Sequence, residues 1–140
     1  MAYQRILCPV DLSEFSREAI KVASSMAKAG DGKVIFLFVA MPELPHSAGA
    51  AISEVDHVIE EQRHEFDQVK PTIDGVECEH VLIRGEPIHV IVDYVKENDI
   101  DLVVMPTHGR SGLLRLLMGS VAEHVVRKAP CPVLVIKTPE

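Results

Sequence analysis

The segment from Pro106 to Ser120 holds the residues best suited to bind an anion. Its glycines let a ligand come close to the main chain, and Gly119 and Ser120 stand directly before a helix expected to begin near Val121. The first amides of a helix have no carbonyl partner and carry the positive end of the helix dipole. Together with the Ser120 hydroxyl, these amides suit a phosphate group. The pattern therefore indicates a phosphate-binding loop.

The same residues allow an interpretation that needs no ligand. Ser120 and Glu123 have the spacing of a capping box, in which the two side chains satisfy amides of the first helical turn. From the residues alone, both interpretations stay open.

Motifs of the common catalytic sites are absent from the chain. It has no Gly-x-x-x-x-Gly-Lys-Ser/Thr loop, no Gly-x-Gly-x-x-Gly after a strand and no Gly-x-Ser-x-Gly elbow. None of the seven histidines forms a His-x-x-x-His pair in a zinc pattern. We therefore expect no catalytic residue and no metal site.

The elements that must position the phosphate-binding loop alternate along the chain. The apolar runs have the length of strands, and the continuous run at 34–40 is typical of a strand buried on both faces. Such alternation predicts a parallel α/β sheet with helices on both faces. The expected strands cover residues 6–10, 34–40, 76–83, 102–105 and 133–136, and the expected helices begin near Ser13, Ile52, Pro87 and Val121.

Ligands of such sheets bind at the carboxyl ends of the strands. Two loops stand out there, from Pro9 to Ser13 after the first strand and from Pro106 to Ser120 after the fourth. Asp11 gives the first loop a carboxylate. The same side chain could simply form an Asx-turn before a helix that starts at Ser13.

The composition excludes several other classes of protein. The chain has 140 residues, of which 47% are hydrophobic and 25% charged, as expected of one packed domain over residues 1–140. Its net charge of −7 disfavours nucleic acid as a partner. Its apolar runs are far shorter than the roughly 20 residues of a membrane-spanning helix. With no signal-peptide pattern at the start, we expect a cytoplasmic protein without a membrane partner.

Three stretches of the chain resemble the universal stress protein family. They are Ile6 to Ser13 (ILCPVDLS), Val103 to Gly112 (VVMPTHGRSG) and the closing residues from Gly119 to Ile136. The resemblance spans essentially the whole chain. It implies the adenine nucleotide alpha hydrolase-like fold, with a five-stranded parallel open sheet in the order 3-2-1-4-5 and, commonly, a homodimer.

The ATP-binding branch of that family has the signature Gly-x-x-Gly, nine residues, then Gly-Ser or Gly-Thr. This chain has Gly109, nine residues, then Gly119-Ser120, but Pro106 stands at the first glycine. Proline has no amide hydrogen and fixes φ near about −65°, so a contact made by that amide in relatives is lost here. The resemblance implies that the amides of Gly109, Gly119, Ser120 and Val121 contact the nucleotide.

Further site residues follow from the resemblance alone. Asp11 corresponds to the acidic residue near the adenosine, and Val39 to the position that contacts adenine, although Val39 could equally be a core residue. Arg110 could steer phosphate or be a solvated loop charge. The flanking members of the implied site are Pro9, Val10, Met105 and His108.

Two functions remain after these comparisons of motifs. The first is a universal stress protein that binds ATP or AMP, with or without Mg²⁺, and acts by nucleotide occupancy with slow hydrolysis at most. The second is a dimeric interaction module of the same family that binds no nucleotide, which Pro106 favours. In either case we expect a homodimer through the strand from Val133 to Ile136, because an apolar edge strand would otherwise leave backbone groups unpaired.

Overall fold

The computed structural model describes residues 3–41, 52–107 and 118–137, with side chains of the second helix described from residue 57. Five strands alternate with four helices in these residues. The strands are β1 (Arg5–Val10), β2 (Lys33–Ala40), β3 (Glu77–Arg84), β4 (Leu102–Pro106) and β5 (Val133–Ile136). The helices are α1 (Ser16–Gly30), α2 (Ile52–Asp67), α3 (Pro87–Glu97) and α4 (Ser120–Lys128).

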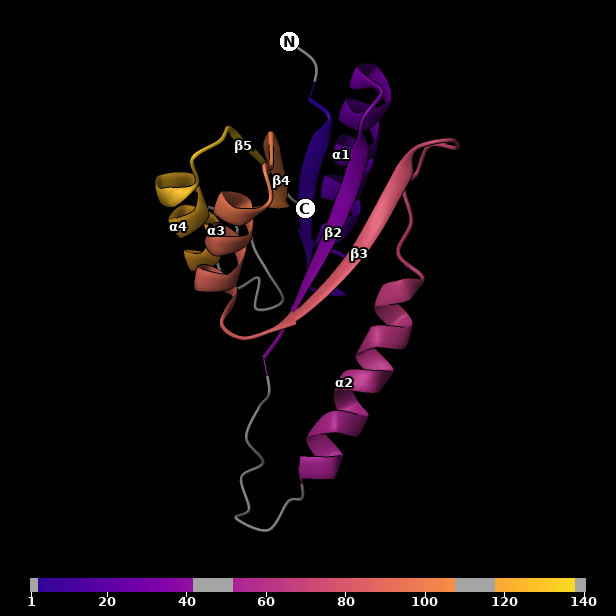
Figure 1. Cartoon of the computed structure of the whole chain (residues 1–140), viewed down its shortest axis with the longest axis vertical. Coiled ribbons are helices and arrows are strands. Elements are labelled where there is room, and N and C mark those ends of the chain that lie inside the picture. The colour runs from indigo at the N-terminus through magenta and orange to yellow at the C-terminus, as the bar shows by residue number, and fades with distance from the viewer. Residues whose placement is uncertain (1–2, 42–51, 108–117, 138–140) are drawn as a thin grey trace.

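The strands form one parallel sheet in the order β3-β2-β1-β4-β5 (Figure 1). This confirms the strand order that the resemblance implied. The strand order reverses between β1 and β4: β2 and β3 are added on one side of β1, and β4 and β5 on the other. β3 and β5 are the two edge strands.

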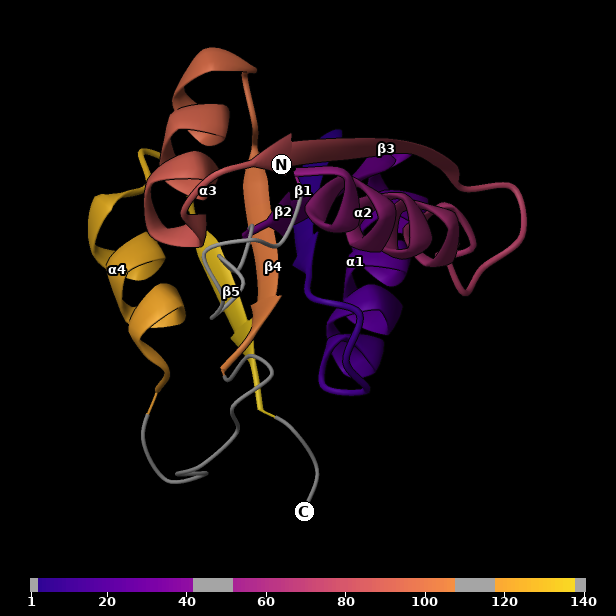
Figure 2. The ribbon, with the colours of Figure 1, turned by 90° about the horizontal axis from the view of Figure 1, so that it is seen from below.

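Two layers of helices cover the sheet, with α1 and α2 on one face and α3 and α4 on the other (Figure 2). Neighbouring residues of a strand point to opposite faces, so Ile6 and Cys8 pack with the α1–α2 layer and Leu7 packs with the α3–α4 layer. The residues Val34–Leu37 of β2 are completely buried. This confirms the prediction that the run at 34–40 is a strand covered on both faces.

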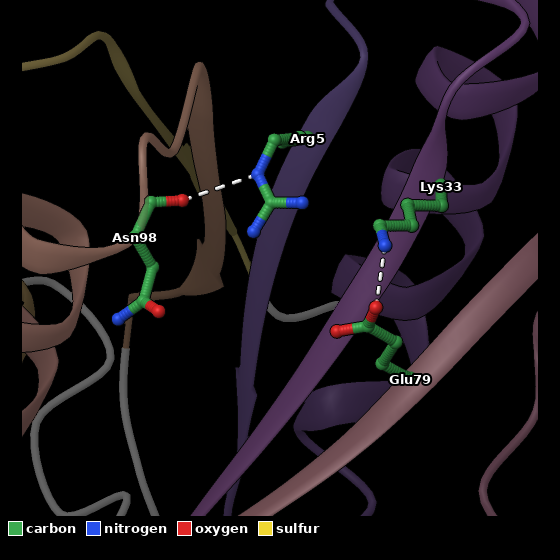
Figure 3. A network of polar contacts seen from close by, with 4 residues as sticks. All are labelled: Arg5, Lys33, Glu79 and Asn98. Carbon is green, nitrogen blue, oxygen red and sulfur yellow. Dashed lines mark hydrogen bonds and ion pairs between the residues drawn. The ribbon is translucent and has the colours of Figure 1, made fainter.

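Polar contacts tie the amino ends of the strands together, on the side of the sheet away from the two loops (Figure 3). Arg5 Nε donates a hydrogen bond to the carbonyl oxygen of Asn98 at 3.1 Å, and Lys33 forms an ion pair with Glu79 across β2 and β3. None of these four residues belongs to the implied site. Their contacts therefore hold the framework and leave the carboxyl ends of the strands to the ligand.

The start of α1 differs from the prediction. The helix begins at Ser16 and not at Ser13, because residues 13–16 form a separate turn in which the Ser16 amide donates to the Ser13 carbonyl at 3.2 Å. Cys8, Cys78 and Cys131 are free thiols. No helix within the described ranges is long and apolar enough to cross a membrane.

Candidate functional site

The ladder between β1 and β4 ends well before the strands do. These strands are paired only at Ile6 with Leu102 and at Leu7 with Val103, whereas β4 stays paired with β5 as far as Pro106 with Ile136. A reversal of strand order such as this one, between β1 and β4, is where open α/β sheets bind ligands. The implied site therefore lies at a place that the fold leaves open.

Proline at position 106 removes a donor from that opening. The amides of Val103 and Thr107 donate to carbonyls of Pro132 and Ile136, on the β5 side. Successive amides of a strand point in opposite directions, so an amide at position 106 would point toward β1. The missing hydrogen is thus one that would have faced the opening between β1 and β4. Pro9 of β1 likewise offers no amide hydrogen.

The turn after β1 is built around Asp11. Its Oδ1 accepts hydrogen bonds from the Ser13 amide at 3.0 Å, the Ser13 hydroxyl at 2.5 Å and the Ser16 hydroxyl at 3.2 Å. The Asx-turn interpretation of Asp11 is therefore confirmed. Between these residues Leu12 has φ 65°, a left-handed conformation that is uncommon outside glycine. The carboxylate is held in one place beside the opening.

The capping-box interpretation of Ser120 and Glu123 is wrong. Gly119 is the N-cap residue of α4, with φ −64° and ψ 159°, and no side chain in the described part of the chain caps the helix. Ser120 is already the first helical residue. The Glu123 carboxylate instead contacts Arg127 at 2.6 Å, one turn further along. Among the residues that the structure describes, no side chain at the start of α4 would thus substitute for a ligand.

Two of the four implied amides are well placed for an anion. Ser120 and Val121 open the helix, whose first internal hydrogen bond runs from the Glu123 amide to the Gly119 carbonyl at 2.9 Å. Their amides therefore have no acceptor within α4. The amide of Gly119, by contrast, already donates to the carbonyl oxygen of Thr107 at 2.7 Å. Gly119 supports the site and does not present its amide to it.

The other implied residues divide between the two faces of the sheet. Val10 is buried on the α1–α2 face, whereas Met105 is buried on the α3–α4 face and half-buried Val39 packs there too. Val39 therefore contributes to the core, as its alternative interpretation held. His108, Gly109 and Arg110 lie outside the described residues.

Two residues that position the site were missed in the sequence. Ser16 is 3% exposed, and its hydroxyl bridges the amide and the carboxylate of Asp11; Thr107 anchors Gly119. The spacing Asp-x-Ser-x-x-Ser was a usable signal for Ser16. No local signal pointed to Thr107, because its role depends on β5. Within the part of the chain that the structure describes, no three His, Cys, Asp or Glu side chains gather to hold a metal ion.

A sheet with this strand order, opened between β1 and β4 beside a helix start, has the adenine nucleotide alpha hydrolase-like fold. The family model for the universal stress protein family matches residues 2–137. The chain belongs to the universal stress protein family.

Named relatives agree with this membership. The chain is similar to the universal stress protein MJ0531 of Methanocaldococcus jannaschii, with 36% identity over 99% of this chain and 84% of the relative. A universal stress protein solved in complex with cAMP is 26% identical, with a TM-score of 0.72 over 99% of this chain and 100% of that one. The universal stress protein of Archaeoglobus fulgidus in complex with dAMP is 25% identical, with a TM-score of 0.66 over 98% and 100%.

Proposed function

We propose that this protein binds an adenine nucleotide, ATP or AMP, with a phosphate at the amides of Ser120 and Val121. The observation that carries the proposal is the start of α4, where these two amides have no acceptor within the helix and no capping side chain from the described residues. A phosphate there accepts charge-assisted hydrogen bonds and interacts favourably with the helix dipole. Two solved relatives hold adenine nucleotides, cAMP in one case and dAMP in the other.

The turn of Asp11 supplies the other half of the proposed site. Its carboxylate is fixed by the hydrogen bonds of Ser13 and Ser16, directly after β1, the strand whose pairing with β4 ends early. A ribose hydroxyl suits such an acceptor, and the adenine would then lie toward Val39 at the end of β2. In the proposed complex, Pro9, Val10 and Met105 form the buried strand ends beneath the nucleotide.

The donors on α4 and β4 are few for a triphosphate. Position 106 has none, and the Gly119 amide is engaged with Thr107. In the proposed complex, Mg²⁺ is held mainly by the phosphate oxygens, because the described residues offer no cluster of metal ligands. We assign the protein a regulatory role in the cytoplasm as one functional domain over residues 1–140, exerted through nucleotide occupancy, with slow hydrolysis at most.

Calorimetric titration with AMP, ATP and adenosine tests this function. Adenosine lacks the phosphate, so we expect it to bind at least about tenfold more weakly than AMP. This difference corresponds to the loss of one or two charge-assisted hydrogen bonds. Amide NMR should place the largest shifts of the AMP titration at Ser120 and Val121. Equal affinity for adenosine and AMP would show that the phosphate does not bind at these amides. No binding of either at millimolar concentration would leave the interaction module as the function.

A homodimer through β5 is proposed alongside, on a separate observation. β5 lies at the edge of the sheet and pairs only with β4 among the described strands. Leu134 exposes 37% of its surface there. A second copy pairing along this edge would satisfy the backbone groups and cover that side chain.

A further inference from the structure

A second surface hollow lies on the α1–α2 face of the molecule. It is a cleft of about 400 Å³, bounded on one side by the start of α1 with Ser13, Arg17 and Ile20, and on the other by the segment after α2 with Val69, Lys70 and Thr72. The amides of Ser120 and Val121 belong to α4, which covers the opposite face of the sheet (Figure 2). The cleft is therefore separate from the proposed phosphate position.

Both walls of the cleft are held by hydrogen bonds. On the α1 side, Asp11 fixes the amide and the hydroxyl of Ser13. On the other side, Nε2 of His80 donates to the carbonyl oxygen of Val69 at 2.6 Å, and the Thr72 amide donates to the Ser24 hydroxyl at 3.0 Å. The cleft thus exists without a ligand, which lowers the ordering cost of binding.

One cation enters the cleft from each wall. In the described ranges, neither Arg17 nor Lys70 forms an ion pair with a carboxylate, although Glu14 also lies at the rim. Two like charges that share a hollow repel each other, and an anion between them removes that repulsion. The charge of the cleft therefore favours an anionic group on an otherwise acidic protein.

Apolar side chains provide the rest of the lining. Ile20 lies on the α1 side and Val69 on the other, and Leu12 adds a third aliphatic group. Leu12 holds the left-handed φ of 65° within the Asp11 turn, a conformation that persists only where its surroundings enforce it. A ligand that matches this lining carries an apolar body as well as a charge.

We propose that the cleft binds a small organic anion, with its charged group between Arg17 and Lys70 and its apolar body against Ile20, Val69 and Leu12. Bidentate contact from the arginine and a point charge from the lysine suit a carboxylate or phosphate monoester equally. Thr72 also lies in the lining of the cleft.

Probes that share one alkyl chain but differ in their polar group separate the contribution of charge to binding from that of apolar contact. Hexanoate, hexanol and hexylamine are titrated into the protein, with inorganic phosphate as a fourth ligand, and amide NMR shifts of Leu12, Ser13 and Thr72 report binding. We expect hexanoate to bind more tightly than any of the other three. Equal binding of hexylamine would overturn the role of the cations, and equal binding of phosphate would overturn the role of the apolar lining.

Charge reversal then locates the contact. The double variant Arg17→Glu, Lys70→Glu should weaken hexanoate binding at least about tenfold, because two attractions become repulsions. The double variant Lys21→Glu, Lys28→Glu is the control with the same change of net charge, on the same helix as Arg17 and outside the cleft lining, and should change the affinity less than about twofold. Equal losses in both variants would show that hexanoate follows net charge alone and would overturn the site.

Discussion

The amide of Gly119 donates a hydrogen bond to the carbonyl oxygen of Thr107 at 2.7 Å. Thr107 in turn donates its own amide to Ile136 at 3.0 Å, so the start of α4 is fastened to β4 and β5. The next two amides, those of Ser120 and Val121, are thereby presented at the end of the sheet with no partner in the helix. Gly119, which belongs to the nucleotide signature, here anchors the helix start whose next two amides we propose as phosphate donors.

Replacing Ser120 by proline isolates one of those donors. Proline is favoured at the first position of a helix, and Gly119 before it already has the extended ψ of 159° that proline requires. The variant should therefore fold normally and lose one amide hydrogen. We expect AMP affinity to fall about tenfold, the worth of one hydrogen bond to a charged group, measured by calorimetry.

Ser120→Ala is the matched control for that variant. It removes the hydroxyl and keeps the amide, so its AMP affinity should stay within about threefold of wild type. A thermal melt of both variants checks that α4 is intact. If Ser120→Pro is folded and binds AMP as tightly as Ser120→Ala, the phosphate does not lie on this amide.

Pro106→Gly restores the donor that the signature has lost. The directions of the Val103 and Thr107 amides place a new amide at 106 toward β1, where the ladder with β4 has ended. We expect ATP affinity to rise by about tenfold, from a charge-assisted hydrogen bond of roughly 1.5 to 3 kcal/mol less about 1 kcal/mol of added glycine entropy. Pro106→Ala also restores the amide, at a smaller entropic cost, and should show the same gain. Unchanged affinity in both would mean that position 106 only shapes the loop.

Most of the framework could be read from the sequence because it depends on local pattern. The run at 34–40 has no polar residue, since both faces of β2 are covered by helices. The strand order, in contrast, followed from the resemblance, because periodicity does not say which strands are neighbours. The start of α1 was misplaced by three residues, since Asp11 draws Ser13 into a turn before the helix can begin.

The details of the site were harder to predict for a physical reason. A capping box and a bare helix start have the same sequence at Ser120 and Glu123, and the difference depends on whether Glu123 turns back or contacts Arg127. The engagement of the Gly119 amide depends on Thr107, which is held by a strand far along the chain. Such contacts are tertiary, so the local spacing of residues does not predict them.

Leu134→Lys tests the proposed dimer edge. Leu134 is exposed on β5, whereas Val135 packs against the α3–α4 face, so a lysine at 134 leaves the core intact. Charged residues on an edge strand prevent pairing with a second chain. We expect wild type to sediment as a dimer at micromolar concentration and the variant as a monomer.

Val126→Lys serves as the control for that variant, because Val126 is 45% exposed on α4 and lies off the edge strand. It should remain a dimer if β5 forms the interface. A monomeric wild type, or a dimer that survives Leu134→Lys, would count against this edge.

Cys8 should make the protein less stable at alkaline pH. Burial raises the pKa of its thiol from 9.0 to about 12, because the thiolate would lie in the core without water. Below pH 9 the thiol is protonated in both the folded and the unfolded chain and has no effect. Between pH 9 and 12 only the unfolded chain releases the proton, so the free energy of unfolding falls by up to about 1.4 kcal/mol per pH unit.

Cys8→Ala should lose some stability at pH 8, but its free energy of unfolding should fall less steeply as the pH rises. Urea unfolding from pH 8 to 10.5 measures both proteins. The other thiols and Tyr94 titrate in both proteins and cancel in the difference, so parallel declines would contradict a buried, protonated Cys8.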